Sequence, residues 1–311
     1  MSIAKSFDHF IEEKCFQSCT LCYNEGKKRI RGDRDLESYE KRGYLHDEYR
    51  IFHLKDSEKK VFAFHYHDFY KVLLLLDGRL NYCVEGRNFS LEPNDLVLIK
   101  AGEIHRPELL DDSPYERIIL YLAPDFLDRF ADMADLRYCF DKAHQHGTNV
   151  LRLHDAGRSQ LLRVCRGLAE KPEGFGGDLY RQTKLLEFLI LLNRAVADHD
   201  IRYIPAPQED AKILPILNYI NENLTAPLNV EMLAERFYIS RYYLMHLFRA
   251  ETGYTVLGDI TEKRLLLARQ LMRGGRSITE ACFEAGFANY ASFLRAFKKH
   301  YGSLPSAAQM E

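Results

Sequence analysis

Residues 233–253 read LAERFYISRYYLMHLFRAETG, and residues 278–305 repeat the same pattern as ITEACFEAGFANYASFLRAFKKHYGSLP. The offset between the two copies is 48 residues before the central turn and 49 after it. The matching positions are Val230, Leu233, Ala234, Phe237, Leu244, Leu247, Phe248 and Gly253 in the first copy and Ile278, Ala281, Cys282, Ala285, Phe293, Ala296, Phe297 and Gly302 in the second. Each copy predicts a helix, a short turn and a second helix, an arrangement that can offer one helix to a DNA groove.

Capping residues predict where these helices begin. Asn229 and Ser240 precede the helices of the first copy, a capping box starts at Ser277, and Asn289 precedes the last helix. Between the copies, residues 256–272 predict one helix, which spans about 25 Å at ~1.5 Å per residue. When the width of the packed copies is added, the expected distance between the two second helices is close to ~34 Å. This is the distance between successive major grooves on one face of DNA.

The outward faces of the second helices carry residues that suit DNA. They are Ser240, Arg241, Tyr242, Met245, His246 and Arg249 in the first copy and Asn289, Tyr290, Ala291, Ser292, Arg295, Lys298 and Lys299 in the second. Arginine binds guanine O6 and N7 through two hydrogen bonds, and serine, tyrosine and lysine commonly bind phosphates. A helical domain with solvated basic faces, serving only protein interaction, is the alternative; the duplication favours DNA.

The two stretches, with ITEKRLLLARQLM at residues 260–272 between them, resemble the tandem helix-turn-helix domain of the AraC/XylS transcription regulators over residues about 210–309. The most specific part is GF-x5-F-x3-FKK-x2-G-x2-P at residues 286–305. The resemblance implies two reading helices in adjacent major grooves. Carried over by position, the residues that face bases are Arg241, Tyr242, Met245 and His246 in the first copy and Tyr290, Ala291, Ser292 and Arg295 in the second.

The sequence also departs from the family pattern and is unequal between the copies. Residues 307–309, Ala-Ala-Gln, replace the aromatic and basic ending common in the family, which leaves a terminal phosphate contact open. His246 stands where the second copy has Arg295. A neutral imidazole reads bases less strongly than arginine, so the second copy is expected to discriminate more.

Composition limits how DNA binding can arise. The chain has 311 residues and a net charge of −2, and the balance from residue 210 onward is only +2. Bulk charge therefore cannot bind DNA, and local clusters must. The sequence lacks an apolar run of about 18 residues and a signal peptide's apolar core, and its seven cysteines are an odd number. These features predict a cytoplasmic protein with no membrane segment.

The remainder of the chain predicts a sensor made of strands followed by helices. Short apolar runs broken by turn signals predict strands at 61–67, 70–76, 79–85, 95–101 and 115–122, typical of a small β-barrel. The predicted domains are an N-terminal extension at 1–55, a barrel at 56–123, a helical dimerisation region at 124–200, a linker at 201–210 and the tandem helix-turn-helix domain at 211–311. The fold class is α+β multidomain.

Three histidines are placed to converge at the mouth of the barrel. His65 and His67 end one predicted strand and His105 follows a later one, an arrangement that resembles a cupin metal site and the cupin-like sensor of many AraC-type regulators. The metal-binding pattern has a carboxylate four residues after the second histidine, where this chain has Lys71. An ammonium disfavours a divalent cation and favours an anion or a hydroxyl-rich ligand held by some of His65, His67, Lys71, Tyr82 and His105. Structural histidines in a closed barrel remain an alternative, as does a metal.

Near the N-terminus, Cys15, Cys19 and Cys22 have the spacing of the iron–sulfur motif of radical SAM enzymes. No repeated strand–helix units follow them, which argues against that class. A zinc or redox-sensing site with His9 as a fourth ligand is a second interpretation, and incidental cysteines are the favoured one.

Taken together, the sequence predicts a dimeric transcription regulator and not an enzyme. It binds promoter DNA, responds to a small polar effector such as a sugar, and meets RNA polymerase if it is an activator. No cofactor is expected. The alternative is a cupin metalloenzyme, or a metal or redox sensor, with an accessory DNA-binding domain.

Overall fold

The computed structural model describes residues 45, 47–56, 62–155, 159–170, 172–207 and 212–308. The chain divides into two compact units. The N-terminal unit comprises Met1–Val84 and Asn88–Ala206, and the C-terminal unit comprises Glu85–Arg87 and Pro207–Glu311.

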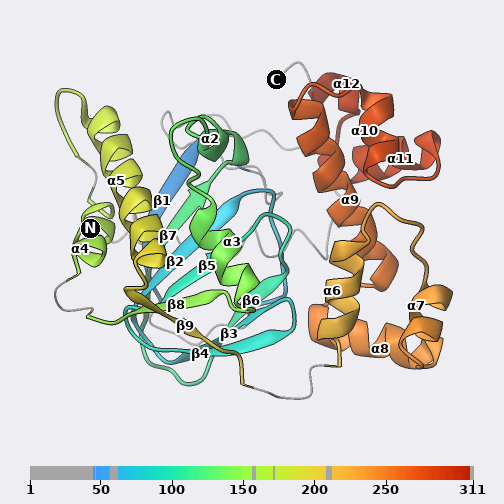
Figure 1. The fold of residues 1–311 in the computed structure, drawn as a ribbon, viewed down its shortest axis with the longest axis horizontal. Coiled ribbons are helices and arrows are strands. Elements are labelled where there is room, and N and C mark those ends of the chain that lie inside the picture. The colour runs from blue at the N-terminus through green and yellow to red at the C-terminus, as the bar shows by residue number, and fades with distance from the viewer. Residues whose placement is uncertain are drawn as a thin grey trace, which may run out of the picture. The chain divides into compact units, whose positions relative to one another are not determined.

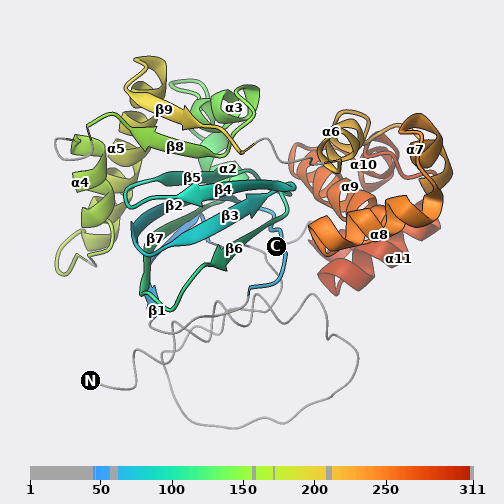
Figure 2. The same cartoon turned by 90° about the horizontal axis from the view of Figure 1, so that it is seen from below.

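Two sheets form the N-terminal unit (Figure 2). The first has the order β1–β7–β2–β5–β8–β9, with β1 at Tyr49–Asp56, β7 at Tyr115–Leu122, β2 at Tyr70–Asp77, β5 at Leu96–Ile99, β8 at Val150–Leu153 and β9 at Ile201–Ile204. The second has the order β4–β3–β6, with β4 at Arg87–Leu91, β3 at Leu80–Val84 and β6 at His105–Leu109. The strands thus form two sheets that face each other.

The run of leucines in β2 is explained by burial on both faces. Val72 and Leu74 face a core under the helices, whereas Leu73 and Leu75 face the core between the two sheets. Since successive side chains on a strand point to opposite sides, a continuous apolar run marks a strand in the middle layer. Strands β5 and β7 follow the same alternation.

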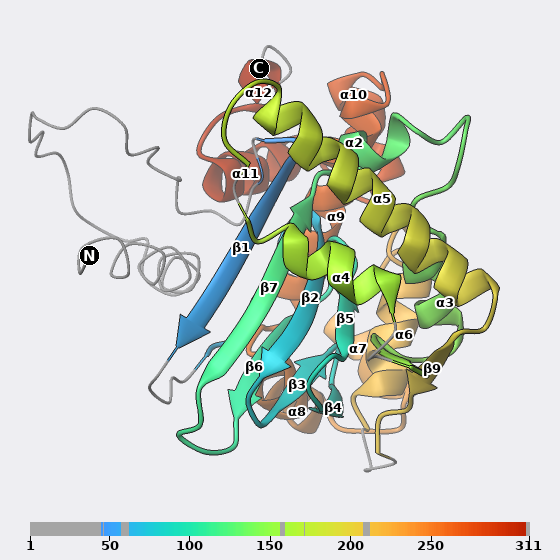
Figure 3. The ribbon, with the colours of Figure 1, turned by 90° about the vertical axis from the view of Figure 1, so that its left-hand side faces the viewer.

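Helices cover the other face of the six-stranded sheet (Figure 3). They are α2 at Pro124–Asp128, α3 at Tyr138–Gln145, α4 at Gln160–Gly167 and α5 at Gly177–Ala197. The buried face of α5 carries Leu185, Phe188, Leu189, Leu192 and Val196. This helix therefore packs on the six-stranded sheet.

Three segments differ from the sequence predictions. Residues 49–55, assigned to the N-terminal extension, form β1 together with Asp56, because each residue from Tyr49 to Asp56 pairs with a residue of β7. Ile201–Ile204, assigned to the linker, forms β9 on β8, ahead of the prolines that end it. Residues 62–67, predicted as a strand, form only an isolated bridge between His65 and His105.

Two hydrophobic cores hold the C-terminal unit around one long helix (Figure 1). Its helices are α6 at Leu214–Glu222, α7 at Val230–Arg236, α8 at Arg241–Thr252, α9 at Val256–Arg273, α10 at Ile278–Glu284, α11 at Tyr290–Tyr301 and α12 at Pro305–Ala308. Helix α9 gives Val256 and Ile260 to the core of α6–α8, and Leu265, Ala268 and Met272 to the core of α10 and α11. It is the predicted helix between two helix-turn-helix motifs.

The predicted caps are present. The side chains of Asn229, Ser240 and Asn289 accept hydrogen bonds from the backbone amides at the starts of α7, α8 and α11. Ser277 forms the predicted capping box at the start of α10. Gly253 and Gly302 end α8 and α11 in the left-handed conformation, at φ +75° and +77°, which explains the glycine repeated in both copies.

The fold class is confirmed: a sheet-rich N-terminal domain and a helical C-terminal domain with two helix-turn-helix motifs. None of the helices that the structure describes combines the length and the apolar character that a membrane span needs.

Candidate functional sites

The outer face of α8 carries a cluster of large exposed side chains. Tyr242 is 71% exposed and Met245 48%, and the rings of Tyr242 and His246 lie 4.1 Å apart, centroid to centroid. Arg241 and Arg249 are exposed on the same helix, and Nη1 of Arg241 donates a hydrogen bond to Oε1 of Glu231 at 3.1 Å. Glu231, in α7, was not singled out from the sequence, because a helix-surface glutamate gives no local signal.

Compared with the outer face of α8, that of α11 carries smaller and more basic side chains. Tyr290, Ala291, Ser292, Arg295, Lys298 and Lys299 are all exposed. Nη2 of Arg295 donates a hydrogen bond to Oγ of Ser292 at 3.1 Å, one helical turn away. Nδ1 of His300 contacts a carboxylate oxygen of Glu262 in α9, which ties α11 to α9.

A backbone clamp joins the two motifs through the loop between α6 and α7. Nε of Arg264, in α9, donates to the carbonyl of Leu224 at 2.8 Å, and its Nη2 donates to the carbonyl of Ala226 at 2.6 Å. Gly286 opens the turn of the second motif at φ +91° and lies against Thr225 in the same loop. The position of one reading helix relative to the other is therefore set by a loop held on two sides.

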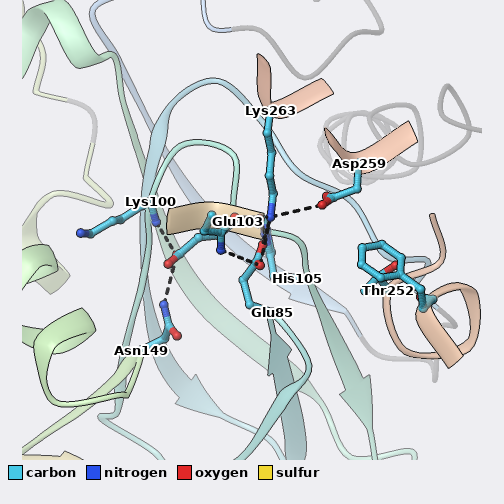
Figure 4. A network of polar contacts seen from close by, with 10 residues as sticks. Glu85, Lys100, Glu103, His105, Asn149, Thr252, Asp259 and Lys263 are labelled. Carbon is cyan, nitrogen blue, oxygen red and sulfur yellow. Dashed lines mark hydrogen bonds and ion pairs between the residues drawn. The ribbon is translucent and has the colours of Figure 1, made fainter. Parts of the chain in front are cut away.

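A buried charge cluster also belongs to the C-terminal unit (Figure 4). Nζ of Lys263 lies 2.8 Å from Oδ1 of Asn221, 3.1 Å from Oε2 of Glu85 and 3.5 Å from Oδ2 of Asp259. Burial raises the pKa of Asp259 to about 6, although the Lys263 ammonium opposes it. Burial alone would lower the pKa of Lys263, but the two carboxylates outweigh it and raise that pKa.

In the N-terminal unit, the structure brings the three predicted histidines together. The ring centroids of His65 and His105 lie 4.3 Å apart, and those of His67 and His105 lie 4.8 Å apart. Both His67 and His105 are buried, and Phe69 stacks on the His67 ring at 3.9 Å. The histidine cluster thus forms although only one of its members, His105, lies in a strand.

Hydrogen bonds set the protonation of each ring in the histidine cluster. Nδ1 of His67 lies 2.7 Å from the carbonyl oxygen of Phe69, and Nδ1 of His105 lies 2.9 Å from that of Glu103. A carbonyl oxygen only accepts, so each Nδ1 carries the proton and each Nε2 offers a lone pair. Both Nε2 atoms are buried and have no hydrogen-bond partner among the residues that the structure describes.

Burial keeps the cluster uncharged. It lowers the pKa of His65 to about 3 and the pKa values of His67 and His105 well below the usual range. The ammonium of Lys71 lowers all three further. Neutral imidazoles with free Nε2 lone pairs are hydrogen-bond acceptors.

Lys71 is itself buried beside two tyrosines. Its Nζ lies 5.9 Å from the ring centroid of Tyr82 and 6.0 Å from that of Tyr121. Tyr121 faces Lys71 across the pairing of β2 with β7, a neighbour that no local sequence pattern reveals. Within the described ranges, no group of three or more His, Cys, Asp or Glu side chains could hold a metal ion.

Cys15, Cys19 and Cys22 fall outside the described residues. The described residues Cys83, Cys139, Cys165 and Cys282 are buried and form no disulfide bond.

Comparison with known proteins matches both halves of the chain. Residues 50–189 match the AraC-like ligand binding domain, and residues 233–310 match a helix-turn-helix domain. The chain is 22% identical over 254 residues to the transcriptional activator RhaS of Klebsiella pneumoniae, covering 79% of this chain and 87% of that protein. It is 24% identical over 248 residues to LumQ, a probable transcriptional regulator of Photobacterium leiognathi, covering 79% and 92%.

Among solved structures, ToxT from Vibrio cholerae aligns with 85% of this chain and 98% of its own, at 13% identity and a TM-score of 0.34. The two family matches define the class: a transcription regulator with a ligand-binding domain and a DNA-binding domain. The chain belongs to the AraC/XylS family.

Proposed function

We propose that this regulator binds promoter DNA as a homodimer in the cytoplasm and changes its DNA contacts when a hydroxyl-bearing small molecule enters the sensor. The observation that carries the sensing half is the pair of buried Nε2 atoms of His67 and His105, which have no hydrogen-bond partner in the described part of the chain. The observation that supports the DNA half is the pair of capped helices with exposed polar and basic faces.

The residue roles on DNA follow from exposure and chemistry. Residues proposed to face bases are Arg241, Tyr242, Met245, His246, Tyr290, Ala291, Ser292 and Arg295. Those proposed to meet phosphates are Ser240, Arg249, Asn289, Lys298 and Lys299. The cationic groups suit phosphate oxygens, and the helix starts at Ser240 and Asn289 add backbone amides.

The donor and acceptor pattern of the histidine cluster supports one chemical class of effector. Because His67 and His105 are neutral and offer only lone pairs at Nε2, a carboxylate oxygen would face two acceptors and repel them. A hydroxyl group donates to an Nε2 and can accept from the Lys71 ammonium at the same time. We therefore favour the hydroxyl-rich alternative, such as a sugar, over an anion, with His65 and Tyr82 completing the set.

Subunit pairing is proposed through α5. Leu179 is 69% exposed, Tyr180 54% and Ile190 41%, on a helix whose opposite face is buried on the sheet. Apolar side chains at this exposure on one face suit contact with the same helix of a second chain. We keep the predicted domain boundaries as part of the proposal. Because residues 201–204 form β9, the proposed linker is residues 205–210.

The mechanism is a population shift. A ligand that binds one arrangement of the dimer better than another changes how often both reading helices engage DNA, and so changes contact with RNA polymerase if the protein is an activator. No catalytic step is proposed.

Thermal denaturation of the full-length protein against a ligand panel tests the sensing half. Sugars and other neutral polyols are compared with carboxylates of equal size. A hydroxyl-bearing ligand should raise Tm in the wild type and not in Lys71→Met, because a ligand that binds only the folded state stabilises it. Stabilisation by carboxylates alone would contradict the proposal. The Lys142→Met variant, at a partly exposed site on α3, is the control for loss of a lysine.

A further inference from the structure

The first reading helix presents an aromatic and apolar surface where the second presents a basic one. On the outer face of α8, in its first half, Tyr242 and Met245 are 71% and 48% exposed. The Tyr242 ring contacts the His246 ring in a tilted arrangement, with 4.1 Å between the ring centroids and 49° between the ring planes. At the position of Tyr242, α11 carries Ala291.

The charged group at the start of α8 is already engaged. The guanidinium of Arg241 donates to the carboxylate of Glu231, whereas that of Arg295 donates to the neutral hydroxyl of Ser292. Among described residues, no acidic side chain pairs with Arg295. Arg295 therefore keeps its full charge available for an acceptor, while Arg241 shares its charge with a carboxylate.

These two surfaces suit different bases. In the major groove only thymine carries a methyl group, which apolar side chains contact, and guanine offers two acceptors that arginine binds. We propose that Tyr242 and Met245 read thymine methyl groups in the first half-site, so that the operator has a thymine-rich half-site for α8 and a guanine-containing one for α11. This inference rests on the proposed DNA contacts of α8 and α11.

The test removes single methyl groups from DNA. A duplex is first selected from random-sequence DNA by its binding to the full-length protein, and Arg295→Ala then identifies the half-site of α11 by the loss of discrimination there. Each thymine of the other half-site is replaced in turn by deoxyuridine, which pairs identically and lacks only the methyl group. Replacement of the contacted thymine should weaken binding about fourfold, the worth of one buried methyl group.

Variants of the exposed side chains keep the test specific. Tyr242→Ala and Met245→Ala should bind thymine and deoxyuridine duplexes equally, whereas the conservative Tyr242→Phe and Met245→Leu should keep the difference. Deoxyuridine in the α11 half-site should have little effect, and 7-deazaguanine there, which lacks N7, should weaken the wild type but not Arg295→Ala.

Each outcome has a separate meaning. If no duplex is enriched and binding is absent at low salt, the proposed DNA contacts themselves fail. If a duplex is enriched but every thymine of the α8 half-site can be replaced without loss, the thymine inference is overturned while the DNA contacts stand. Unchanged DNA binding by Tyr242→Ala and Met245→Ala would likewise overturn it and would assign this surface to a protein partner.

Discussion

Gly286 lies so close to Thr225 that a Cβ added to the glycine would meet the Cα of Thr225 at 2.8 Å and its carbonyl oxygen at 2.9 Å. The second helix-turn-helix motif thus turns directly on the loop between α6 and α7. Arg264 holds the same loop through two carbonyl groups. The spacing between the two reading helices therefore depends on the backbone contact at Gly286 and on the hydrogen bonds of the Arg264 side chain.

Gly286→Ala should lower the free energy of unfolding by about 2–5 kcal/mol, since it adds left-handed strain and an overpacked contact. Gly275→Ala is the matched control, because Gly275 has φ +89° with no atom within 4 Å of its added Cβ. Gly275→Ala should lower the free energy of unfolding by the cost of the left-handed strain alone, about 1–2 kcal/mol. Urea unfolding of both variants measures the difference, and equal losses would show that the contact with Thr225 does not matter.

Lys263→Met should destabilise the C-terminal unit by about 3–5 kcal/mol, because the carboxylates of Glu85 and Asp259 would stay buried without their cation. Lys212→Met removes the same charge from an exposed site of the same unit and should change stability little. Thermal unfolding of the two variants measures their loss of stability. If Lys263→Met loses as little stability as Lys212→Met, water reaches the charge cluster.

Acid should destabilise the N-terminal unit below about pH 6.5. The unfolded chain protonates His67 and His105 near that pH, whereas burial and Lys71 keep their folded pKa values well below it. The unfolded state then binds more protons, so stability is complete above pH 6.5 and falls as the pH drops, by up to about 1.4 kcal/mol per pH unit for each histidine.

Urea unfolding between pH 5 and 8 measures this slope. The double variant His67→Phe, His105→Phe should show a shallower slope, and His53→Gln, at an exposed strand position, should keep it. A slope that the double variant leaves unchanged would assign the acid sensitivity to other groups.

Glu231→Gln should strengthen DNA binding roughly two- to fivefold, because it frees the Arg241 guanidinium and removes a negative charge near the phosphates. Glu108→Gln makes the same charge change on β6 of the N-terminal unit, at an exposed site. Fluorescence anisotropy with a labelled duplex compares them; a gain of equal size in both variants would trace the effect to net charge alone.

The helices of the C-terminal unit could be predicted from sequence because short-range features mark where they begin and end. Caps at Asn229, Ser240 and Asn289 and glycines at helix ends are read within a few residues of where they act. Asp259 and Lys263, four apart on a helix, look like a surface pair, and only the tertiary structure shows that they are buried.

The N-terminal unit was harder to predict because its contacts join distant strands. The sequence placed His65, His67 and His105 together, but Tyr121 beside Lys71 depends on how β2 pairs with β7. Strand β1 was missed because its exposed residues, His53 and Lys55, are polar and its partners in β7 lie 59 to 73 residues away along the chain.

The central claim is that two unequal reading helices bind promoter DNA, and its most direct measurement is affinity for the selected duplex as a function of salt. The wild-type protein should bind the duplex at 50 mM salt, and its affinity should fall steeply as the salt concentration rises towards 200 mM. Lys298→Ala should lower the slope of log affinity against log salt by about 1, and Arg295→Ala should lose about 1–3 kcal/mol of discrimination at one half-site with a smaller change in slope. Absence of duplex binding at low salt, or binding that neither variant alters, would contradict the account.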